Sequence, residues 1–460
     1  MTPSTSLTSS VAAALRDLRS SVRGTVLVGS DPGYDDARRL WNGAVDRHPA
    51  LIVRCADDRD VVRAVLAARE RGLPLSVRGG GHDWAGRAVR DGGVVLDLTG
   101  MREVTVDPHA GTAHVGGGAR SGDVAAAAAV HGMVPVTGTV NVVGLVGLTL
   151  AGGYGLLNGR FGLALDNLLS ARVVLADGLQ VTASPAEHPE LFWALRGGGG
   201  NFGVVTSARY RVHPVDTVLS GMLLFPLAEA PAVLRGYREL IAEAPDELTV
   251  MAGFFGGPDG QPLLFLLPLW SGTPQQGEPL LSRLERLGKP VSAQLGPMAY
   301  RDVLGQFDQA VVDGRHNEVR TRWLPRLAED SVAAIVAAAA QWTSPYSMVM
   351  LHHFHGAAAR VPVPDTAFAL RREHLMVEIL ASWVPTGASA DTCHRRWART
   401  LGDNLAGRAL PGGYPNLLDV DEYERARQAY GPNAERLLAA KRHFDPDDVF
   451  RAVPSLTPPR

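Results

Sequence analysis

The spacing of apolar positions in the first half of the chain predicts an alternation of strands and helices. Residues 50–55 form an apolar run of strand length, and residues 57–71 follow with apolar positions at helical spacing. Asp57 or Asp58 stands where the N-cap of this helix is expected. Residues 75–77 predict the next strand, so this part of the chain combines both element types.

The pattern changes near Pro214. Longer helical stretches at residues 228–244 and 331–342 are separated by apolar runs such as residues 263–267 and 348–351. This pattern predicts a second domain, in which helices flank a mixed or antiparallel sheet.

The predicted fold class is α+β with two domains. A chain of 460 residues is too long for one ordinary hydrophobic core. We assign the first domain to residues 1–215 and the second to residues 216–412. A charged, largely helical segment follows at residues 413–460.

Composition and charge exclude several classes of protein. Hydrophobic residues make up 46% and charged residues 20% of the chain, as in soluble globular proteins. A formal net charge of −2 leaves no broad basic field for nucleic-acid phosphates. No apolar run approaches the ~20 residues of a membrane span, so neither nucleic acid nor membrane is expected as a partner. The N-terminal stretch lacks the apolar centre of a signal peptide, and we expect a cytoplasmic location.

One glycine-rich loop suggests a site for a phosphorylated ligand. Residues 76–83 read Ser-Val-Arg-Gly-Gly-Gly-His-Asp. Three consecutive glycines let the backbone approach a ligand closely, their N–H groups form an anion nest, and Arg78 adds positive charge. His82 carries an imidazole that can attack an electrophilic cofactor carbon. Taken alone, the run fits an ordinary glycine turn equally well.

Two further glycine clusters favour a long cofactor. They lie at residues 144–155 and 196–205. Three glycines of the third glycine cluster, at residues 196–205, match the spacing GxGxxG. Residues 204–212, however, predict a strand where a dinucleotide-binding unit needs a helix. We therefore reject a Rossmann site. A groove with several close backbone approaches suits FAD, which combines a diphosphate, a ribityl chain and a flat ring.

These motifs together resemble the FAD-linked oxidases of the berberine-bridge-enzyme type, within the vanillyl-alcohol-oxidase superfamily. The matches cover nearly the whole chain and are densest over residues 34–213 and 414–451. They include the run from Arg78 to His82 and the glycine cluster at residues 144–155. Actinobacterial polyketide-tailoring flavoenzymes of this family are similar, which implies a role in secondary metabolism.

The resemblance implies a PCMH-type FAD-binding domain, formed by residues 1–215 together with residues 413–460. The substrate domain, residues 216–412, would then cover the edge of the flavin. The family's cofactor-binding positions fall here on Arg78, Gly79, Gly80, Gly81, His82, Asp83, Val140, Gly144, Gly147, Gly152, Gly153, Gly155, Gly203, Val205 and Asn416.

The resemblance also implies that His82 is bonded to the 8α-methyl group of FAD. Many relatives carry a second bond, from a cysteine at the position of Val140. Valine cannot form that bond, and Cys55 and Cys393 are far away in sequence. We predict a single covalent attachment, through His82. In similar proteins a valine at the position of Val143 accompanies oxidase activity, because it leaves room for dioxygen, although ordinary packing also explains a valine.

Candidate catalytic groups lie on the substrate side. Tyr414 stands where relatives have a tyrosine beside the flavin, which implies either a base or a side chain that packs on the ring. In Leu-His-His-Phe-His at residues 351–355, alternation on a strand brings His353 and His355 to one face. Either imidazole is a candidate base, or a polar group that lines a cavity or forms hydrogen bonds within the core. A zinc site on this pair lacks an evident third ligand, so no metal is expected.

The expected function is the two-electron oxidation of a small molecule by covalently held FAD. Hydride passes from a substrate C–H to flavin N5, a base takes the partner proton, and dioxygen accepts the electrons to give hydrogen peroxide. An alcohol, an amine and a phenolic polyketide are all compatible substrates. One alternative is a flavoprotein with structural FAD that cyclises a biosynthetic intermediate without net redox change. Another is a binding protein.

Overall fold

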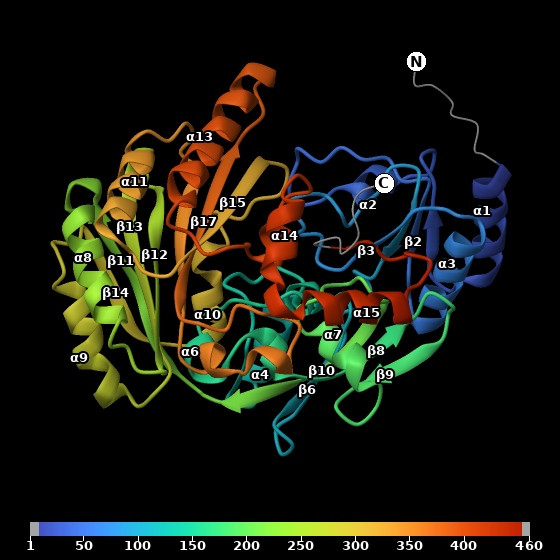
Figure 1. Cartoon of the computed structure of the whole chain (residues 1–460), viewed down its shortest axis with the longest axis horizontal. Coiled ribbons are helices and arrows are strands. Elements are labelled where there is room, and N and C mark those ends of the chain that lie inside the picture. The colour runs from blue at the N-terminus through green and yellow to red at the C-terminus, as the bar shows by residue number, and fades with distance from the viewer. Residues whose placement is uncertain (1–8, 453–460) are drawn as a thin grey trace.

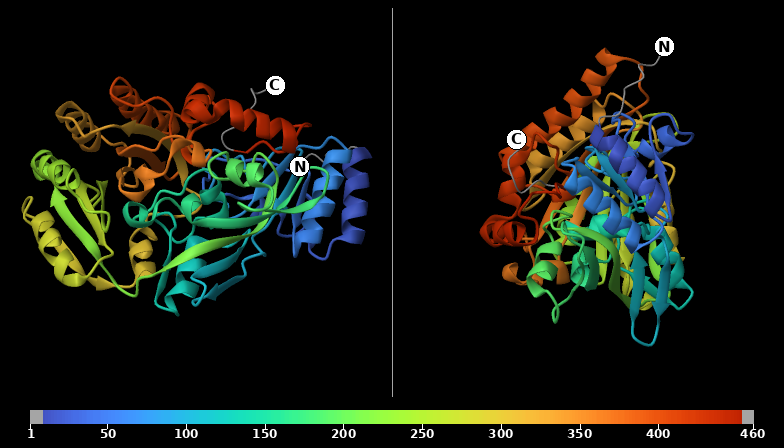
Figure 2. Two further views of the ribbon diagram at one scale, coloured as in Figure 1. Left: turned by 60° about the horizontal axis from the view of Figure 1, so that its bottom comes forward. Right: turned by 90° about the vertical axis from the view of Figure 1, so that its right-hand side faces the viewer.

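The computed structural model describes residues 9–452, which form three β-sheets surrounded by helices (Figure 1). Two sheets come from residues 25–214, and the third comes from residues 218–383. Figure 2 shows the third sheet beside the other two, with the C-terminal helices, drawn in red, returning across the molecule. The predicted α+β class is confirmed.

The first sheet is small and mixed. Its elements are β1 (Thr25–Leu27), β2 (Leu51–Arg54), β3 (Leu75–Arg78) and β4 (Val94–Asp97), with α1 (Ser9–Ser21), α2 (Tyr34–Arg38) and α3 (Asp58–Glu70). The strand order is β1-β2-β4-β3; β2, β4 and β3 are parallel, and β1 is antiparallel to β2. Asp57, one of the two predicted caps, accepts hydrogen bonds from the N–H groups of Arg59 and Asp60 at the start of α3.

The second sheet is antiparallel. Its elements are β5 (Val104–Asp107), β6 (Thr112–Gly116), β7 (Met133–Pro135), β8 (Leu168–Val174), β9 (Gln180–Ala183) and β10 (Val204–Pro214), with helices α4 (Ser121–Ala129), α5 (Leu145–Leu150), α6 (Asn158–Phe161) and α7 (Pro189–Leu195). The order is β5-β6-β10-β8-β9, and β7 pairs with β10. Because β10 follows the third glycine cluster directly, no helix begins there, as the rejection of a Rossmann site required.

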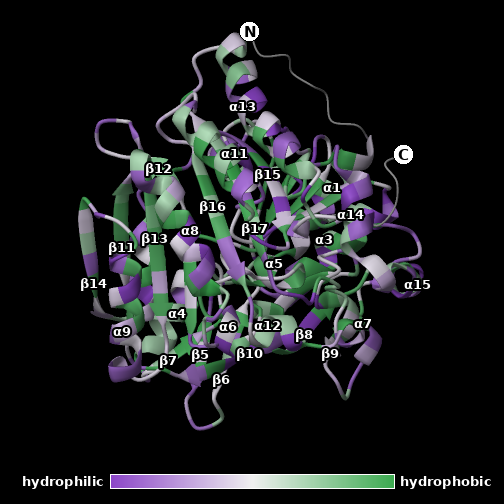
Figure 3. Ribbon diagram, turned by 60° about the vertical axis from the view of Figure 1, so that its left-hand side comes forward, coloured by the Kyte–Doolittle hydropathy of each residue, from purple (hydrophilic) through white to green (hydrophobic). Residues whose placement is uncertain are grey.

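The third sheet has seven antiparallel strands in the order β14-β11-β13-β12-β16-β17-β15. Its elements are β11 (Val218–Pro226), β12 (Leu248–Gly256), β13 (Pro262–Trp270), β14 (Ser292–Met298), β15 (His316–Leu324), β16 (Met348–Phe354) and β17 (His374–Trp383), with helices α8 (Ala230–Ile241), α9 (Pro274–Glu285), α10 (Tyr300–Leu304), α11 (Glu329–Ala340), α12 (Ala357–Arg360) and α13 (Ala388–Ala406). Figure 3 shows that β11, β12 and β13 are largely hydrophobic.

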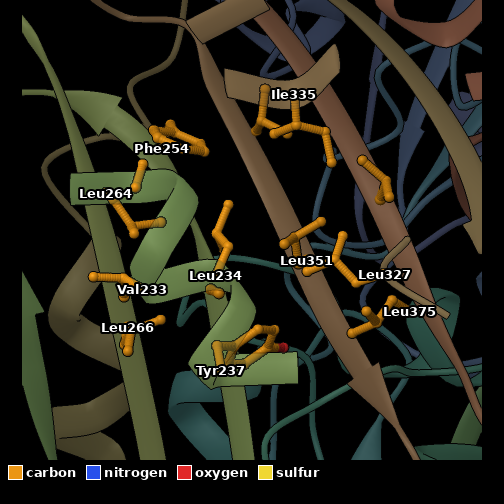
Figure 4. Close-up of a cluster of buried hydrophobic side chains, with 14 of the residues drawn as sticks. Val233, Leu234, Tyr237, Phe254, Leu264, Leu266, Leu327, Ile335, Leu351 and Leu375 are labelled. Carbon is orange, nitrogen blue, oxygen red and sulfur yellow. The ribbon is translucent and has the colours of Figure 1, made fainter. Parts of the chain in front are cut away.

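One face of the third sheet is covered by helices. The helices α8, α9, α11 and α13 bury their apolar side chains against it in one large cluster. Figure 4 shows Leu234 and Tyr237 of α8 in one cluster with Leu264 and Leu351 of the strands. Removing this much apolar surface from water is the main favourable contribution to folding of the domain. The opposite face of the sheet is left to line a cavity.

The C-terminal segment closes the structure. Its helices are α14 (Tyr423–Ala429) and α15 (Ala434–Phe444), and α15 packs on α7 of the first half of the chain. The buried ammonium of Lys441 pairs with Asp445 and donates to the carbonyl oxygens of Asn201, at 2.9 Å, and Phe450, at 2.6 Å. These bonds fix the end of the chain against the third glycine cluster. Within residues 9–452, no helix has both the length and the apolar character that a membrane span requires.

Candidate active site

A long cavity lies between the third sheet and the other two. One part of its wall comes from the three glycine clusters and the end of β3, together with Phe450, Arg451 and Ala452 from the C-terminal segment. The other part comes from β15, β16 and β17. Tyr414, Asn416 and Leu417 lie between the two parts and also line the cavity. Segments that are far apart in sequence therefore enclose one elongated space.

The predicted histidine loop forms part of this wall. It leaves β3 after Arg78, and Gly81 adopts φ of +71°, a left-handed conformation that glycine tolerates best. Among the described residues, no hydrogen-bond acceptor contacts the backbone N–H groups of Gly80, Gly81 and His82. Free N–H groups at a cavity wall are donors for an anionic ligand.

The environment of His82 keeps its imidazole neutral. Its ring stacks on Trp41, with centroids 4.3 Å apart and planes 23° from parallel. Desolvation by burial is the main cause that lowers the pKa of His82 to about 4, and the positive charge of Arg120 lowers it further. At neutral pH the ring therefore carries a free lone pair, which a nucleophile needs.

Two glycine clusters meet at the cavity wall. A Cβ atom added to Gly80 would lie 2.4 Å from the backbone N of Gly144, so neither loop has room for a side chain there. A Cβ on Gly147, by contrast, would meet no protein atom within 4 Å. Because Gly147 lines the cavity, that open space belongs to the cavity itself. The walls thus let a ligand approach the backbone closely, as predicted for a long cofactor.

Most of the predicted cofactor-binding residues lie at this cavity. Those that line it are Gly79, Gly80, Gly81, His82, Asp83, Val140, Gly144, Gly147, Gly203, Val205 and Asn416, and the predicted Val143 lines it as well.

Arg78, predicted as a cofactor-binding residue, lies outside the cavity lining. Its guanidinium lies 3.8 Å from Asp97 and donates to the carbonyl oxygen of Ala37. A largely buried cation is held by an anionic partner, and Asp97 on the adjacent strand is within reach. The arginines that line the cavity are Arg87 and Arg451.

Gly152, Gly153 and Gly155 also differ from their prediction, because they do not line the cavity. The N–H of Gly153 donates to the hydroxyl of Tyr414 at 2.9 Å. A Cβ on Gly152 would lie 2.6 Å from the Tyr414 ring, and one on Gly155 would lie 2.0 Å from the carbonyl oxygen of Thr137. These glycines thus make space for Tyr414 and neighbouring backbone.

Tyr414 is buried beside the cavity with its hydroxyl in a defined position. That hydroxyl accepts hydrogen bonds from the N–H of Gly153 and, at 3.0 Å, from the side-chain amide of Asn416. Burial raises the pKa of Tyr414 more than these hydrogen bonds lower it. The side chain is therefore a neutral phenol near pH 7. The hydroxyl of the adjacent Tyr154 bonds to Nε2 of His374 at 2.7 Å.

His353 and His355 share one face of β16, and that face turns away from the cavity, which leaves the core-bonding interpretation rather than a base or a lining group. Their rings stack with centroids 3.8 Å apart, and neither lines the cavity. Leu351, on the same face, packs in the helix-covered core. His355 bonds to the hydroxyl of Thr249 at 3.1 Å. Neither imidazole can take a proton from a molecule in the cavity, and within residues 9–452 no group of three His, Cys, Asp or Glu could hold a metal ion.

The other face of β16 supplies a group that sequence reasoning missed. Met348, Met350 and His352 point into the cavity. Nε2 of His352 lies 3.0 Å from a carboxylate oxygen of Glu378 on β17, which lines the cavity too. A single acidic residue inside the apolar run of residues 375–381 was the signal that could have identified Glu378.

Both cysteines lie away from the cavity. Cys55 is buried in the core between the first sheet and α3, where burial raises the pKa of its thiol. Cys393 is exposed on α13. Val140 lines the cavity at the position where many relatives have a cysteine.

Known families match two parts of this chain that line the cavity. A family model described as FAD binding domain matches residues 49–184, and one described as berberine and berberine like matches residues 413–456. (R)-6-hydroxynicotine oxidase of Paenarthrobacter nicotinovorans is 32% identical over 449 residues, which cover 94% of this chain and 96% of that protein. The chain belongs to the berberine-bridge-enzyme-like FAD-linked oxidoreductases.

Further proteins are similar over nearly their whole length. The FAD-linked oxidoreductase pgmH of Aspergillus terreus is 31% identical and is covered to 94%. The crystal structure of 6-hydroxy-D-nicotine oxidase from Arthrobacter nicotinovorans matches with a TM-score of 0.85 at 30% identity, covering 100% of both chains. A xylooligosaccharide oxidase from Myceliophthora thermophila matches with a TM-score of 0.85 at 23% identity and shares the fold.

As a member of the berberine-bridge-enzyme-like family, this protein is an FAD-dependent oxidoreductase, and the cavity fits that cofactor. The open side of Gly147 and the unpaired N–H groups near Gly80 suit a diphosphate and its backbone contacts. The neutral imidazole of His82 stands at the same wall. FAD, when bound there, supplies the acceptor for two electrons.

Proposed function

We propose that this protein is an oxidase that removes hydride from a small, largely apolar substrate bearing a hydroxyl group, with dioxygen as the electron acceptor. The observation that carries the proposal is that His82, Tyr414 and the His352–Glu378 pair line or flank one cavity. The cofactor anchor and the groups able to handle a proton therefore share one cavity. The names of two relatives, (R)-6-hydroxynicotine oxidase and pgmH, agree with small-molecule oxidation.

The proposed attachment of FAD is a single bond to His82. The neutral ring of His82 supports it, and so does the absence of either cysteine from the cavity lining. The side chain of Val140, at the position of the second bond in many relatives, has no nucleophilic atom. Val143 supports dioxygen as the acceptor, because this small side chain lines the cavity.

The proton of the substrate hydroxyl is proposed to pass to His352. A carboxylate only accepts hydrogen bonds, so we assign a proton to Nε2 of His352 in its contact with Glu378. That arrangement leaves the lone pair on Nδ1 free to accept a proton, while Glu378 stabilises the imidazolium that results. Tyr414, as a neutral phenol, would orient the substrate.

The lining of the substrate side supports an apolar, flat substrate. Met348, Met350, Met376 and Leu380 line the cavity around the His352–Glu378 pair. Methionine side chains are polarisable and adapt to aromatic surfaces. An oligosaccharide would leave many hydroxyl groups without partners against this wall, which costs free energy for each unpaired group. A phenolic or other hydroxylated aromatic metabolite fits better.

The test is anaerobic mixing of the purified flavoprotein with a panel of hydroxylated aromatic compounds and, for contrast, oligosaccharides. We expect an aromatic member of the panel to bleach the flavin absorbance, and admission of air to restore it with stoichiometric hydrogen peroxide. Turnover without bleaching or peroxide would replace the oxidase with a non-redox cyclase. Bleaching by the oligosaccharides alone would refute the substrate class.

A further inference from the structure

Trp41 is the aromatic side chain that stacks on the imidazole of His82. The ring centroids are 4.3 Å apart, and both residues line the cavity. Stacking on a large indole restricts rotation of the smaller ring about its side-chain bonds and holds the plane of that ring. Because the lone pair lies in the ring plane, the contact fixes the plane in which His82 presents it.

The backbone around Trp41 holds the same loop. The N–H of Trp41 donates to the carbonyl oxygen of Gly81 at 3.0 Å. The next residue, Asn42, is buried, and its amide donates to the carbonyl oxygens of Trp84, at 2.7 Å, and Asn317, at 3.0 Å. The loop is thus held on both sides of His82.

The indole N–H of Trp41 is enclosed and has no partner among the described residues. Leaving a buried donor unpaired costs free energy. An aliphatic side chain would fill the space without that cost, so packing alone does not account for an aromatic ring here.

We infer that Trp41 is a positioning residue for the covalent attachment of FAD to His82, an inference that rests on the proposed function. In that step a nitrogen of His82 bonds to the carbon of the 8-methyl group. The methyl group and the imidazole each give up one hydrogen, and the two electrons released from the bonds enter the flavin. Dioxygen then takes both electrons and two protons to form hydrogen peroxide, which leaves the attached flavin oxidised.

The test follows covalent attachment over time in full-length protein made by cell-free synthesis with FAD present. Flavin that survives acid precipitation is measured per mole of protein, and the mass of the intact chain confirms it. We expect Trp41→Leu to attach FAD roughly tenfold more slowly than wild type, the effect of about 1.4 kcal/mol on a barrier. Trp41→Phe, which keeps a stacking ring, should recover most of the rate.

Two controls separate positioning from general damage. Phe161→Leu removes a similar stack, that of Phe161 on His213 with centroids 3.7 Å apart, away from the cavity lining, and should leave the rate unchanged. All rates are compared at saturating FAD, so that a change in the affinity of Trp41→Leu for free FAD does not enter the comparison. Attachment at the wild-type rate in Trp41→Leu, or equal slowing in Trp41→Phe, would overturn the inference. Wild-type protein that releases all its flavin in acid would instead overturn the proposed attachment.

Discussion

At the scale of single residues, the site depends on polar groups with defined partners in an otherwise apolar wall. His352 contacts Glu378 at 3.0 Å, and Tyr414 accepts from Gly153 and Asn416. Each of these side chains is held in one orientation by its hydrogen bonds. A substrate between them would find one proton acceptor in a fixed place, which is what general-base catalysis requires.

Replacing Glu378 tests the role of this pair. In Glu378→Gln the amide oxygen can still accept from His352, but the negative charge that stabilises an imidazolium is lost. We expect flavin reduction by substrate to slow by roughly 10²-fold, with the FAD content unchanged, when measured anaerobically by stopped-flow absorbance. Glu373→Gln, an exposed change just before β17, serves as the matched control. A reduction rate within twofold of wild type would remove Glu378 from the mechanism.

At the scale of elements, function depends on which face of a strand or helix meets the cavity. On β16, the residues at 348, 350 and 352 line the cavity, while Val349 and Leu351 pack under the helices. On the short helix α5, Gly147 faces the cavity with nothing opposite its α-carbon. Glycine is a poor helix residue, so its presence there costs stability.

Gly147→Leu tests whether that open space belongs to the cofactor. Leucine is favoured over glycine in a helix by roughly 1 kcal/mol, and the structure has room for the new side chain. We therefore expect a folded protein with much less bound flavin, measured as the ratio of flavin to protein absorbance, with circular dichroism to verify folding. Gly407→Leu, at another open position after α13, should keep its flavin. An undiminished ratio in Gly147→Leu would show that the cofactor lies elsewhere.

At the scale of the whole molecule, the segment that carries Tyr414 is held from both sides. The indole of Trp84, two residues after His82, donates to the carbonyl oxygen of Leu417 at 3.1 Å. The guanidinium of Arg87 donates to the carbonyl oxygen of Leu418 at 2.8 Å. On the other side, Arg320 of β15 pairs with Glu422 at 3.2 Å. The C-terminal segment thereby links the histidine loop to the third sheet.

Buried histidines make the stability of the whole fold depend on pH. Desolvation by burial lowers the pKa of His355 to about 4 and that of His374 to about 3, and it also lowers the pKa of His353. In an unfolded chain a histidine titrates near ~6.5. Below that pH the unfolded state takes up protons that the folded state excludes, so stability falls as the pH drops from about 6.5 towards 4.

The free energy of unfolding is expected to fall by up to about 1.4 kcal/mol per pH unit for each such histidine. Urea unfolding at pH 7.5, 6 and 5 would measure it, and His355→Gln should give a shallower loss than wild type over the same range. Unfolding free energies that stay constant from pH 7.5 to 5 would contradict the prediction.

The sequence by itself determined the features that depend on residue type. Glycine alone lets the backbone approach a ligand as closely as the three clusters allow, and His82 carries the imidazole that we predict to be a nucleophile. These residue types therefore predict a flavin site, and the resemblance to relatives with a cysteine at the position of Val140 implies a single attachment here. The α+β class and the strand after the third glycine cluster followed from local periodicity.

Tertiary structure alone decided which face of each element is used. Alternation on β16 defines two faces, but only the helices packed on one of them show that His352, and not His353 or His355, meets the cavity. Likewise, Arg78 turns to Asp97 because β3 and β4 are neighbours, and Glu378 reaches His352 because β16 pairs with β17. Such contacts depend on the pairing of distant segments, which local sequence patterns do not encode.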